Sequence, residues 1–342
     1  MRVTRESLIR IAKENAQERA FNDHDIVAAY LTGSLVSEAD PMLGGSADID
    51  LVFVHGQRPG LTHEIVRLTP DFHLDIVHRS RDEFKSPREL RTDPLLGHEM
   101  YDPMLLYQRE KFFEFVQAGL RAGFEFHAPA LVLARCRKLL AQARRGWIDL
   151  SDIHQDKAGP LQIRQYLQAL YHAANAIAEL SGGPLPERRF LALFPSRAQA
   201  AERPEFTATL YALLGATSLD AGTISSWIPD WRSAFLAAAE SAKADPHIHA
   251  ARLNYYDKAM EAFLGGEAPI TALWPLIHTW TLACNALADA QIKPWQSACN
   301  HLGLLGSGFE ARTEALDRYL DDIEAHLDEI ATANGLETSS GV

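Results

Sequence analysis

The chain has 342 residues, of which 47% are hydrophobic, so it can bury a large core and two domains are expected. Its 33 Lys and Arg residues against 45 Asp and Glu residues give a net charge of −12, which opposes general attraction to long nucleic acids and anionic membranes. The three cysteines are widely spaced without a Cys-x-x-Cys pattern, so we expect reduced core residues rather than a metal site.

The beginning of the chain carries no sign of export. Its first 20 residues alternate charged and apolar positions and lack the apolar block of a secretory signal. No run anywhere approaches the roughly 20 apolar residues of a membrane span. The expected location is the cytoplasm, away from membranes, and the oligomeric state stays open.

Strand signals are confined to the first third of the chain. Apolar residues at helical spacing predict an amphipathic helix over residues 6–20. Short apolar or β-branched runs then predict strands over residues 25–33, 48–55 and 72–79. A last extended piece is expected near residues 98–107.

Helical periodicity dominates after residue 110. It predicts helices over residues 129–145, 161–181, 205–215, 229–244, 251–265, 272–289 and 309–334. The expected fold is therefore α+β, with a small mixed β-sheet domain over residues 1–110 and an all-α domain over residues 111–335.

Two carboxylates interrupt the apolar strand at residues 48–55. Side chains alternate between the faces of a strand, so Asp48 and Asp50 point to one side while Ile49, Leu51 and Phe53 point to the other. Like charges about 5 Å apart repel by roughly 3 kcal/mol at an effective dielectric constant of about 20, so the pair needs a compensating cation or a shifted pKa.

A third acid, Asp75, lies in the next predicted strand and could join the pair. Three carboxylates on one face suit Mg²⁺, which prefers oxygen ligands. One or two such ions can clamp a triphosphate and orient an in-line attack. His73 shares the face of Asp75, but imidazole is a poor Mg²⁺ ligand, so we expect His73 to be a hydrogen-bond partner or a half-exposed side chain.

A Gly-Ser pair ends the first predicted strand. Gly33 lets the backbone approach a ligand closely, Ser34 adds a hydroxyl donor, and free N–H groups at a following helix can bind phosphate. The nearby sequence Gly44-Gly45-Ser46 fits a flexible turn better than a phosphate site, so we leave it out of the site.

These residues resemble the motif of the nucleotidyltransferase superfamily to which DNA polymerase beta belongs: Gly-Ser, a gap of about ten residues, Asp-x-Asp, then an Asp on a later strand. Here thirteen residues separate Ser34 from Asp48, and the linker lacks the Arg-Gly of small drug-modifying members. The helical remainder is similar in kind to the substrate-binding domains of aminoglycoside nucleotidyltransferases.

The resemblance implies a role for each motif residue. Asp48 and Asp50 would bind two Mg²⁺ ions, with Asp75 as a further ligand that helps to activate the attacking hydroxyl. Gly33 and Ser34 would hold the β- and γ-phosphates. Residues 1–110 would then bind metal and nucleotide, and residues 111–335 would bind the acceptor.

The expected activity is Mg²⁺-dependent transfer of a nucleoside monophosphate from a nucleoside triphosphate, with ATP the expected nucleotide, to a hydroxyl of a small molecule or a protein, releasing pyrophosphate. One alternative is a non-catalytic, nucleotide-binding regulator. Another is a nucleic-acid tailing enzyme, which would need a basic groove. A fused ribonuclease is disfavoured, because Arg91 and His98 lie in a segment that contains Pro and Gly.

Overall fold

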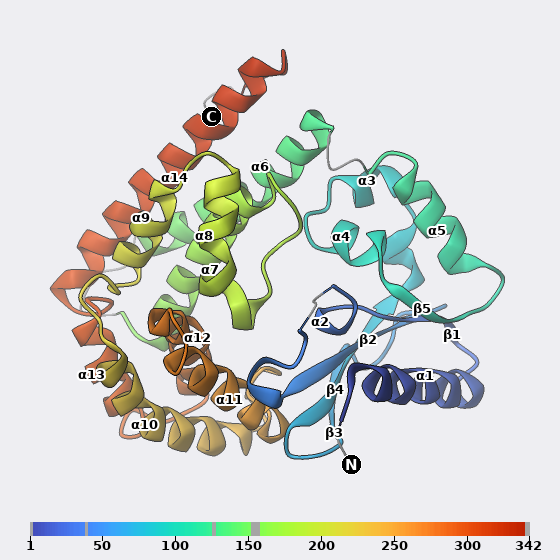
Figure 1. Cartoon of the computed structure of the whole chain (residues 1–342), viewed down its shortest axis with the longest axis horizontal. Helices are drawn as coiled ribbons and strands as arrows, with labels where there is room; N and C mark the ends of the chain where they lie inside the picture. Colours follow the sequence, from blue (N-terminus) through green and yellow to red (C-terminus); the bar gives the residue numbers. More distant parts are fainter. Residues whose placement is uncertain (1–2, 38–39, 125–127, 152–157, 339–342) are drawn as a thin grey trace. The chain divides into compact units, whose positions relative to one another are not determined.

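The computed structural model describes residues 3–37, 40–124, 128–151 and 158–338, which form two compact units. The sheet unit comprises Met1–Glu125 and Ala251–Ala259, and the helical unit comprises Phe126–Ala250 and Met260–Val342. The α+β prediction is confirmed (Figure 1). The predicted domain boundary near residue 110 stays a prediction, because compact packing does not show which segments fold independently.

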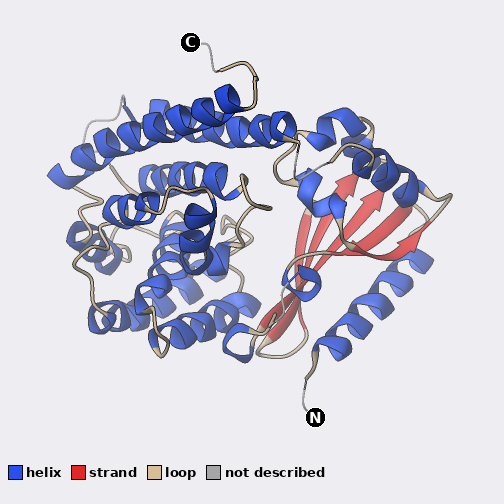
Figure 2. Ribbon diagram, turned by 45° about the horizontal axis from the view of Figure 1, so that its top comes forward, coloured by secondary structure: helices blue, strands red, loops and turns tan. Residues whose placement is uncertain are grey.

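A five-stranded mixed sheet organises the first unit (Figure 2). The strand order is β3-β4-β2-β1-β5. Only β2 and β4 pair in parallel among these strands, and the other neighbours are antiparallel. The strands are β1 Ile26–Leu31, β2 Ala47–His55, β3 His63–Arg67, β4 Phe72–Ser80 and β5 Met104–Gln108.

Helices cover both faces of this sheet. Helix α1, Arg5–Asn22, begins at a Thr4 capping box and packs its small and apolar side chains on the face that carries Ile49, Leu51 and Phe53. The opposite face carries Val52 and Val54 and packs against three short helices. These are α3 Pro87–Arg91, α4 Leu96–Tyr101 and α5 Phe112–Arg121. The alternation leaves the even-numbered residues of β2 on the face opposite α1.

The helical unit is built around two helices that pack against each other, α6, Pro129–Ser151, and α7, Pro160–Ala178. Helix α14, Ser307–Ala333, packs against both. The remaining helices with eight or more residues are α8 Phe190–Ala200, α9 Glu205–Leu213, α10 Ala221–Ala239, α11 Leu253–Leu264, α12 Leu273–Cys284 and α13 Lys293–His301. Helix α11 begins in the sheet unit and ends in the helical unit. None of the helices in the described ranges has the length and apolar character needed to cross a membrane.

Several helix positions differ from the prediction. The segment predicted as extended over residues 98–107 begins as helix α4, and only residues 104–108 form a strand. Helix α10 starts at Ala221 rather than at residue 229, and Pro229 lies inside it. Strand β3 and helices α5, α8 and α13 were missed. Helix α8 contains Pro195, which obscures its periodicity.

Ion pairs join the long helices of the helical unit. Arg144 on α6 pairs with Asp317, Asp321 and Glu324 on α14. These groups are partly exposed, so each pair contributes little by itself. In contrast, Arg135 on α6 pairs with Glu179, just after α7, and both side chains are fully buried.

We expect Glu179→Ala to destabilise the protein by about 3 kcal/mol, because it removes the carboxylate that pairs with the buried Arg135 charge. The urea midpoint of unfolding should fall accordingly. The double variant Arg135→Met/Glu179→Leu should recover part of the loss, since it removes both charges. Lys85→Met, which breaks an exposed pair with Asp82, is the control and should leave the midpoint nearly unchanged. An unchanged midpoint in Glu179→Ala would contradict this account.

Candidate metal centre

The parallel pairing of β2 with β4 places four polar residues side by side. In this register Asp48 lies opposite His73, and Asp50 lies opposite Asp75. The apolar partners between them, Ile49 and Leu74, belong to the core under α1. The acids predicted from the sequence therefore share one face of the sheet.

Asp48, His73 and Asp75 form a compact group of possible metal ligands. One ligand atom from each lies within 4.8 Å of the others. Asp48 is only 5% exposed, His73 is fully buried, and the Asp75 side chain is 12% exposed. Buried carboxylates this close together require a cation to compensate their charge.

The structure supplies one such cation to Asp75. Arg252 Nη1 donates a hydrogen bond of 2.6 Å to Asp75 Oδ2, and His63 on β3 pairs with Asp75 Oδ1. Burial by itself raises the pKa of Asp75, but the hydrogen bond from His63 and the charges of Arg252, His63 and His73 outweigh it and lower the pKa to about 2. Asp75 therefore stays ionised at any physiological pH.

Arg252 comes from a segment that lies far along the chain. It ends a 3₁₀ turn, Ala250–Arg252, directly before α11. Its side chain is buried, and the guanidinium carbon lies 5.6 Å from the ring centroids of both Tyr255 and Tyr256. Burial alone lowers the pKa of Arg252, but the neighbouring Tyr256, Asp75 and Asp48 raise it well above its ordinary value. The guanidinium thus remains charged beside both acids.

A second set of contacts anchors the same segment, Ala251–Ala259, which we call the returning segment. Lys258 Nζ lies 2.8 Å from Asp71 Oδ1, and Asn254 Nδ2 donates to the same oxygen at 3.1 Å. Gly44 lies so close to the Lys258 carbonyl that a Cβ atom there would collide with it. The returning segment is therefore held to the sheet unit independently of Arg252.

The Gly-Ser pair lies next to Asp50. Gly33 has a left-handed backbone, with φ of +71°, and a Cβ atom in its place would collide with the Asp50 carboxylate. The Gly33 carbonyl accepts the N–H groups of Val36 and Ser37, which starts the short helix α2, Ser34–Ser37. Ser34 Oγ is buried without a hydrogen-bond partner among the residues that the structure describes.

These residues fit a divalent cation. Carboxylate oxygens are the ligands that Mg²⁺ and Mn²⁺ prefer, and the imidazole of His73 adds a ligand that a transition metal accepts. The orphaned hydroxyl of Ser34 and the space kept open by Gly33 are consistent with a ligand at the same edge. Asp48, His73 and Asp75 are the residues whose ligand atoms converge and that would hold the ion, whereas Asp50, which the sequence also predicted as a ligand, is not part of this group.

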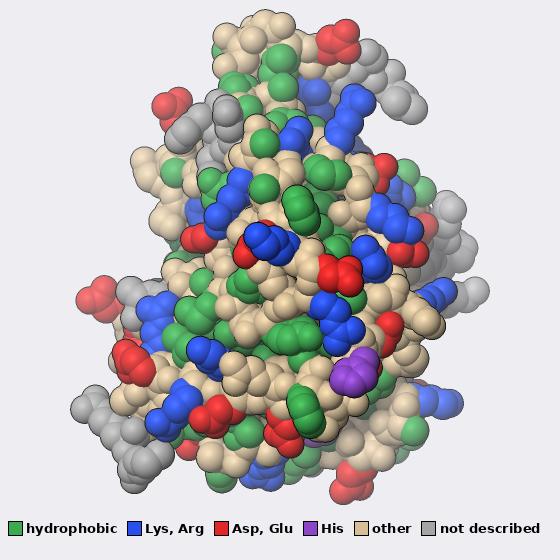
Figure 3. Space-filling model, turned by 90° about the vertical axis from the view of Figure 1, so that its right-hand side faces the viewer, with side chains coloured by type: hydrophobic (Ala, Val, Ile, Leu, Met, Phe, Trp, Pro, Cys, Tyr) green, Lys and Arg blue, Asp and Glu red, His purple; other side chains and the backbone are tan. Residues whose placement is uncertain are grey.

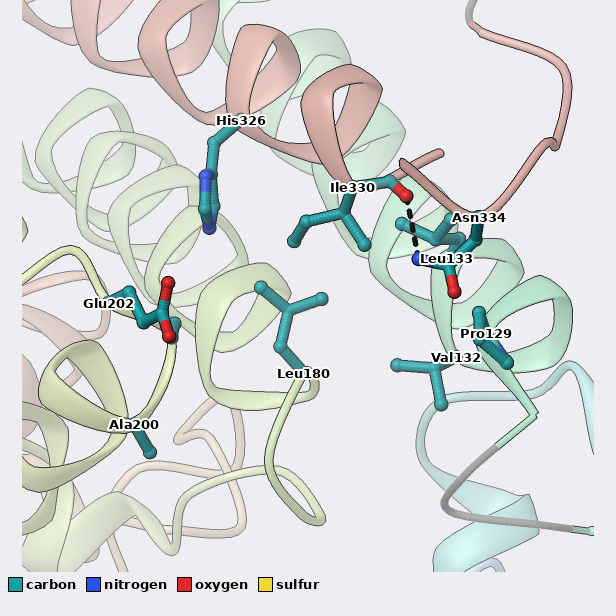
Figure 4. A pocket seen from close by; sticks show the side chains of 10 residues that line it. Pro129, Val132, Leu133, Leu180, Ala200, Glu202, His326, Ile330 and Asn334 are labelled. Atoms are coloured by element: carbon teal, nitrogen blue, oxygen red, sulfur yellow. Dashed lines mark hydrogen bonds between the residues drawn. The ribbon is translucent and has the colours of Figure 1, made fainter. Parts of the chain in front are cut away.

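A pocket elsewhere has a different character. It lies in the helical unit and has a volume of about 310 Å³ (Figure 4). Val132, Leu133, Leu180 and Ile330 form much of its wall, with Glu202 and His326 among its few polar residues. Both ring nitrogens of His326 are buried from solvent, so the pocket offers few accessible polar groups. It lacks the paired carboxylates of the sheet unit.

The sequence located part of this centre and missed the rest. Asp48, Asp50 and Asp75 lie on one face as predicted from strand alternation, and Gly33 and Ser34 lie at its edge. Arg252 and His63 were missed. No local pattern marks Arg252, because its partner lies 177 residues away. His63 could have been found only by recognising β3.

Comparison with solved structures finds distant matches, one of which is named here. The crystal structure of a nucleotidyltransferase-like protein from Exiguobacterium sibiricum is similar to this chain at 11% sequence identity, over 98% of this chain and 96% of that one, with a TM-score of 0.29. A TM-score this low does not establish a common fold. No protein-family model matches the sequence, and a search of curated proteins finds no significant match.

We expect Gly33→Ala to displace the Asp50 carboxylate, because the new Cβ collides with it and alanine disfavours the left-handed backbone. Affinity for Mn²⁺ should fall by about tenfold, as when the groups that orient metal ligands are disturbed. Titration with Mn²⁺ followed by electron paramagnetic resonance measures this. Gly60→Ala is the matched control, since no atom lies near its added Cβ. Unchanged Mn²⁺ affinity in folded Gly33→Ala would contradict the expectation.

We expect Asp75 to contribute a pH-dependent share of stability in metal-free buffer. Its folded pKa of about 2 lies below the ordinary value of 3.8, so the contribution is present above about pH 4 and is lost as the pH falls towards 2. Asp75→Asn should therefore lower the urea midpoint strongly at pH 6 and much less at pH 2.5.

Asp82→Asn is the control for this experiment, because Asp82 is largely exposed and pairs with an exposed lysine. It should change the midpoint little at either pH. An equal effect of Asp75→Asn at pH 6 and pH 2.5 would show that the carboxylate charge is not what stabilises this part of the fold.

Proposed function

We propose that the protein is a divalent-metal-dependent nucleotidyltransferase. The observation that carries this proposal is the convergence of Asp48, Asp50 and Asp75 on one face of the sheet, with ligand atoms of Asp48 and Asp75 within 4.8 Å. Repelling carboxylates are costly to bury, and acids that converge in spite of this cost are typical of functional sites.

The position of the Gly-Ser pair supports a phosphate ligand beside these acids. Gly33 keeps space open against Asp50, and Ser34 supplies a buried hydroxyl whose hydrogen-bonding capacity is not used by the described residues. A triphosphate bound there would lie within reach of the metal ligands. The site would therefore bind a nucleoside triphosphate, with ATP as the first to be tested.

Each residue has a defined part in the proposed reaction. Divalent ions held by Asp48, Asp50 and Asp75 would neutralise phosphate charge and polarise the attacking and leaving oxygens. Ser34 would donate a hydrogen bond to the terminal phosphates. Asp75, with a pKa of about 2 and both oxygens engaged, is too weak a base to take a proton at neutral pH, so we assign it to positioning.

The reaction would join an acceptor hydroxyl oxygen to the α-phosphorus of the nucleotide in line with the leaving pyrophosphate. The bond to the bridging oxygen breaks, and the hydroxyl proton passes to solvent or to a base supplied with the acceptor. We propose a small molecule or a protein as the acceptor.

The charge distribution favours such an acceptor over a long nucleic acid. The chain carries a net charge of −12. On the face shown in Figure 3, basic and acidic side chains are interspersed with apolar ones instead of gathering into a basic track. Nucleic-acid binding draws most of its affinity from clustered Lys and Arg, so a tailing enzyme is the weaker alternative.

A regulatory role is the second candidate function, and one observation favours it. Both oxygens of Asp75 already have protein partners, His63 and Arg252. A site in which a protein cation compensates an acid could bind a nucleotide without turning it over. The two functions differ in whether pyrophosphate is released.

The test measures pyrophosphate release from each of four nucleoside triphosphates with Mg²⁺ or Mn²⁺, using pooled aminoglycosides, cell metabolites and cell protein as acceptors. We expect release from one nucleotide, and a loss of at least about 1,000-fold in Asp48→Asn/Asp50→Asn, because metal-ion catalysis supplies several kcal/mol of transition-state stabilisation. Asp82→Asn, which alters an exposed acid, is the control and should retain full activity.

Two results would change the conclusion. Metal-dependent nucleotide binding without pyrophosphate release would favour the regulatory function. Absence of both nucleotide binding and release would overturn the assignment of the site.

A further inference from the structure

We propose that Arg252 is a resident cation of the acidic site, which weakens the binding of a divalent ion by the free protein. This inference rests on the proposed function, because it assumes that the acids hold metal. It deepens that function by naming a positioning residue that lies outside the metal-ligand set.

The first argument is the contact itself. Arg252 Nη1 lies 2.6 Å from Asp75 Oδ2, and both side chains are largely buried, with 6% and 12% exposed. A buried guanidinium this close to a carboxylate interacts with little screening by solvent. Asp48 also acts on Arg252 electrostatically. Arg252 therefore compensates more than one acid.

The second argument is the position of the charge. Arg252 carries a positive charge at hydrogen-bond distance from Asp75, an acid that the site would offer to a divalent ion. Two cations beside the same carboxylate repel each other, so Arg252 opposes the binding of an ion until a nucleotide brings its own negative charges.

The third argument is that the returning segment is anchored apart from the acids. Lys258 and Asn254 both contact Asp71, and the Lys258 carbonyl packs against Gly44. Because these contacts do not involve the acids of the site, they hold the segment that carries Arg252 whether or not an ion is bound.

The guanidinium is also held from the side of the returning segment. Its carbon lies 5.6 Å from the ring centroids of Tyr255 and Tyr256, which is within cation–π range. The Tyr255 ring meets the His73 ring edge-on at 5.5 Å. Arg252 is thus fixed between two aromatic rings and the acid, which restricts its movement away from Asp75.

The test measures the affinity of the full chain for Mn²⁺ without nucleotide, by electron paramagnetic resonance and calorimetry, in the wild type and in Arg252→Gln. Glutamine can still donate a hydrogen bond to Asp75 but carries no charge. In R252Q we expect Mn²⁺ to bind at least about tenfold more tightly than in the wild type, because a like charge within a few ångströms has been removed.

Two further variants separate charge from structure. Arg252→Lys keeps the charge and should bind Mn²⁺ with an affinity within about threefold of the wild type, whereas the neutral variant should not. Lys258→Gln removes a cation from the same segment that contacts Asp71 instead of the metal ligands. It should leave the affinity for Mn²⁺ unchanged.

Thermal unfolding provides a readout that does not depend on activity. In EDTA, R252Q should unfold at a lower temperature than the wild type, because Asp75 is left without its cation. Added Mn²⁺ should restore most of this loss in R252Q and should raise the unfolding temperature of the wild type less. If R252Q is folded only with Mn²⁺, that result also supports the proposal.

The outcomes distinguish this inference from the proposed function. If the wild type binds Mn²⁺ and R252Q binds it with the same affinity, Arg252 is not a resident cation, and the proposed function stands. If K258Q tightens Mn²⁺ binding as much as R252Q, displacement of the segment explains the effect, and the inference fails. If neither protein binds Mn²⁺, the inference and the metal-dependent function fall together.

Discussion

The parallel pairing of β2 with β4 is the constraint on which the candidate site depends. It fixes Asp48 opposite His73 and Asp50 opposite Asp75, so the ionisable side chains of two strands share one edge of the sheet face. A shift of the register by one residue would turn the acids towards the core under α1 and bring Ile49 and Leu51 to the site. Because packing in the core fixes the register of the two strands, it also fixes which side chains form the site.

This arrangement brings a cost that the rest of the fold must offset. Neighbouring buried carboxylates repel one another, and burial deprives them of water. Arg252 and His63 meet this requirement at Asp75, where each engages one oxygen.

The returning segment shows how a distant part of the chain completes a small domain. Ala251–Ala259 belongs to the sheet unit although the residues on both sides of it belong to the helical unit. Its two anchors, Arg252 on Asp75 and Lys258 on Asp71, both reach β4 or the turn before it. The site is therefore built from two regions of the sequence, which local patterns assign to different domains.

The sequence alone determined the features that depend on local spacing. Period-two alternation placed Asp48 and Asp50 on one face, and the switch from strand to helical periodicity gave the α+β class and most of the long helices. Helices with an internal proline, such as α8 and α10, were missed or shortened, because local propensity there is overridden by packing. Only the tertiary structure decided which cation meets Asp75. The Arg252 contact spans 177 residues, and neither residue carries a local signal of its partner, because such a pair is created by chain topology and not by sequence period.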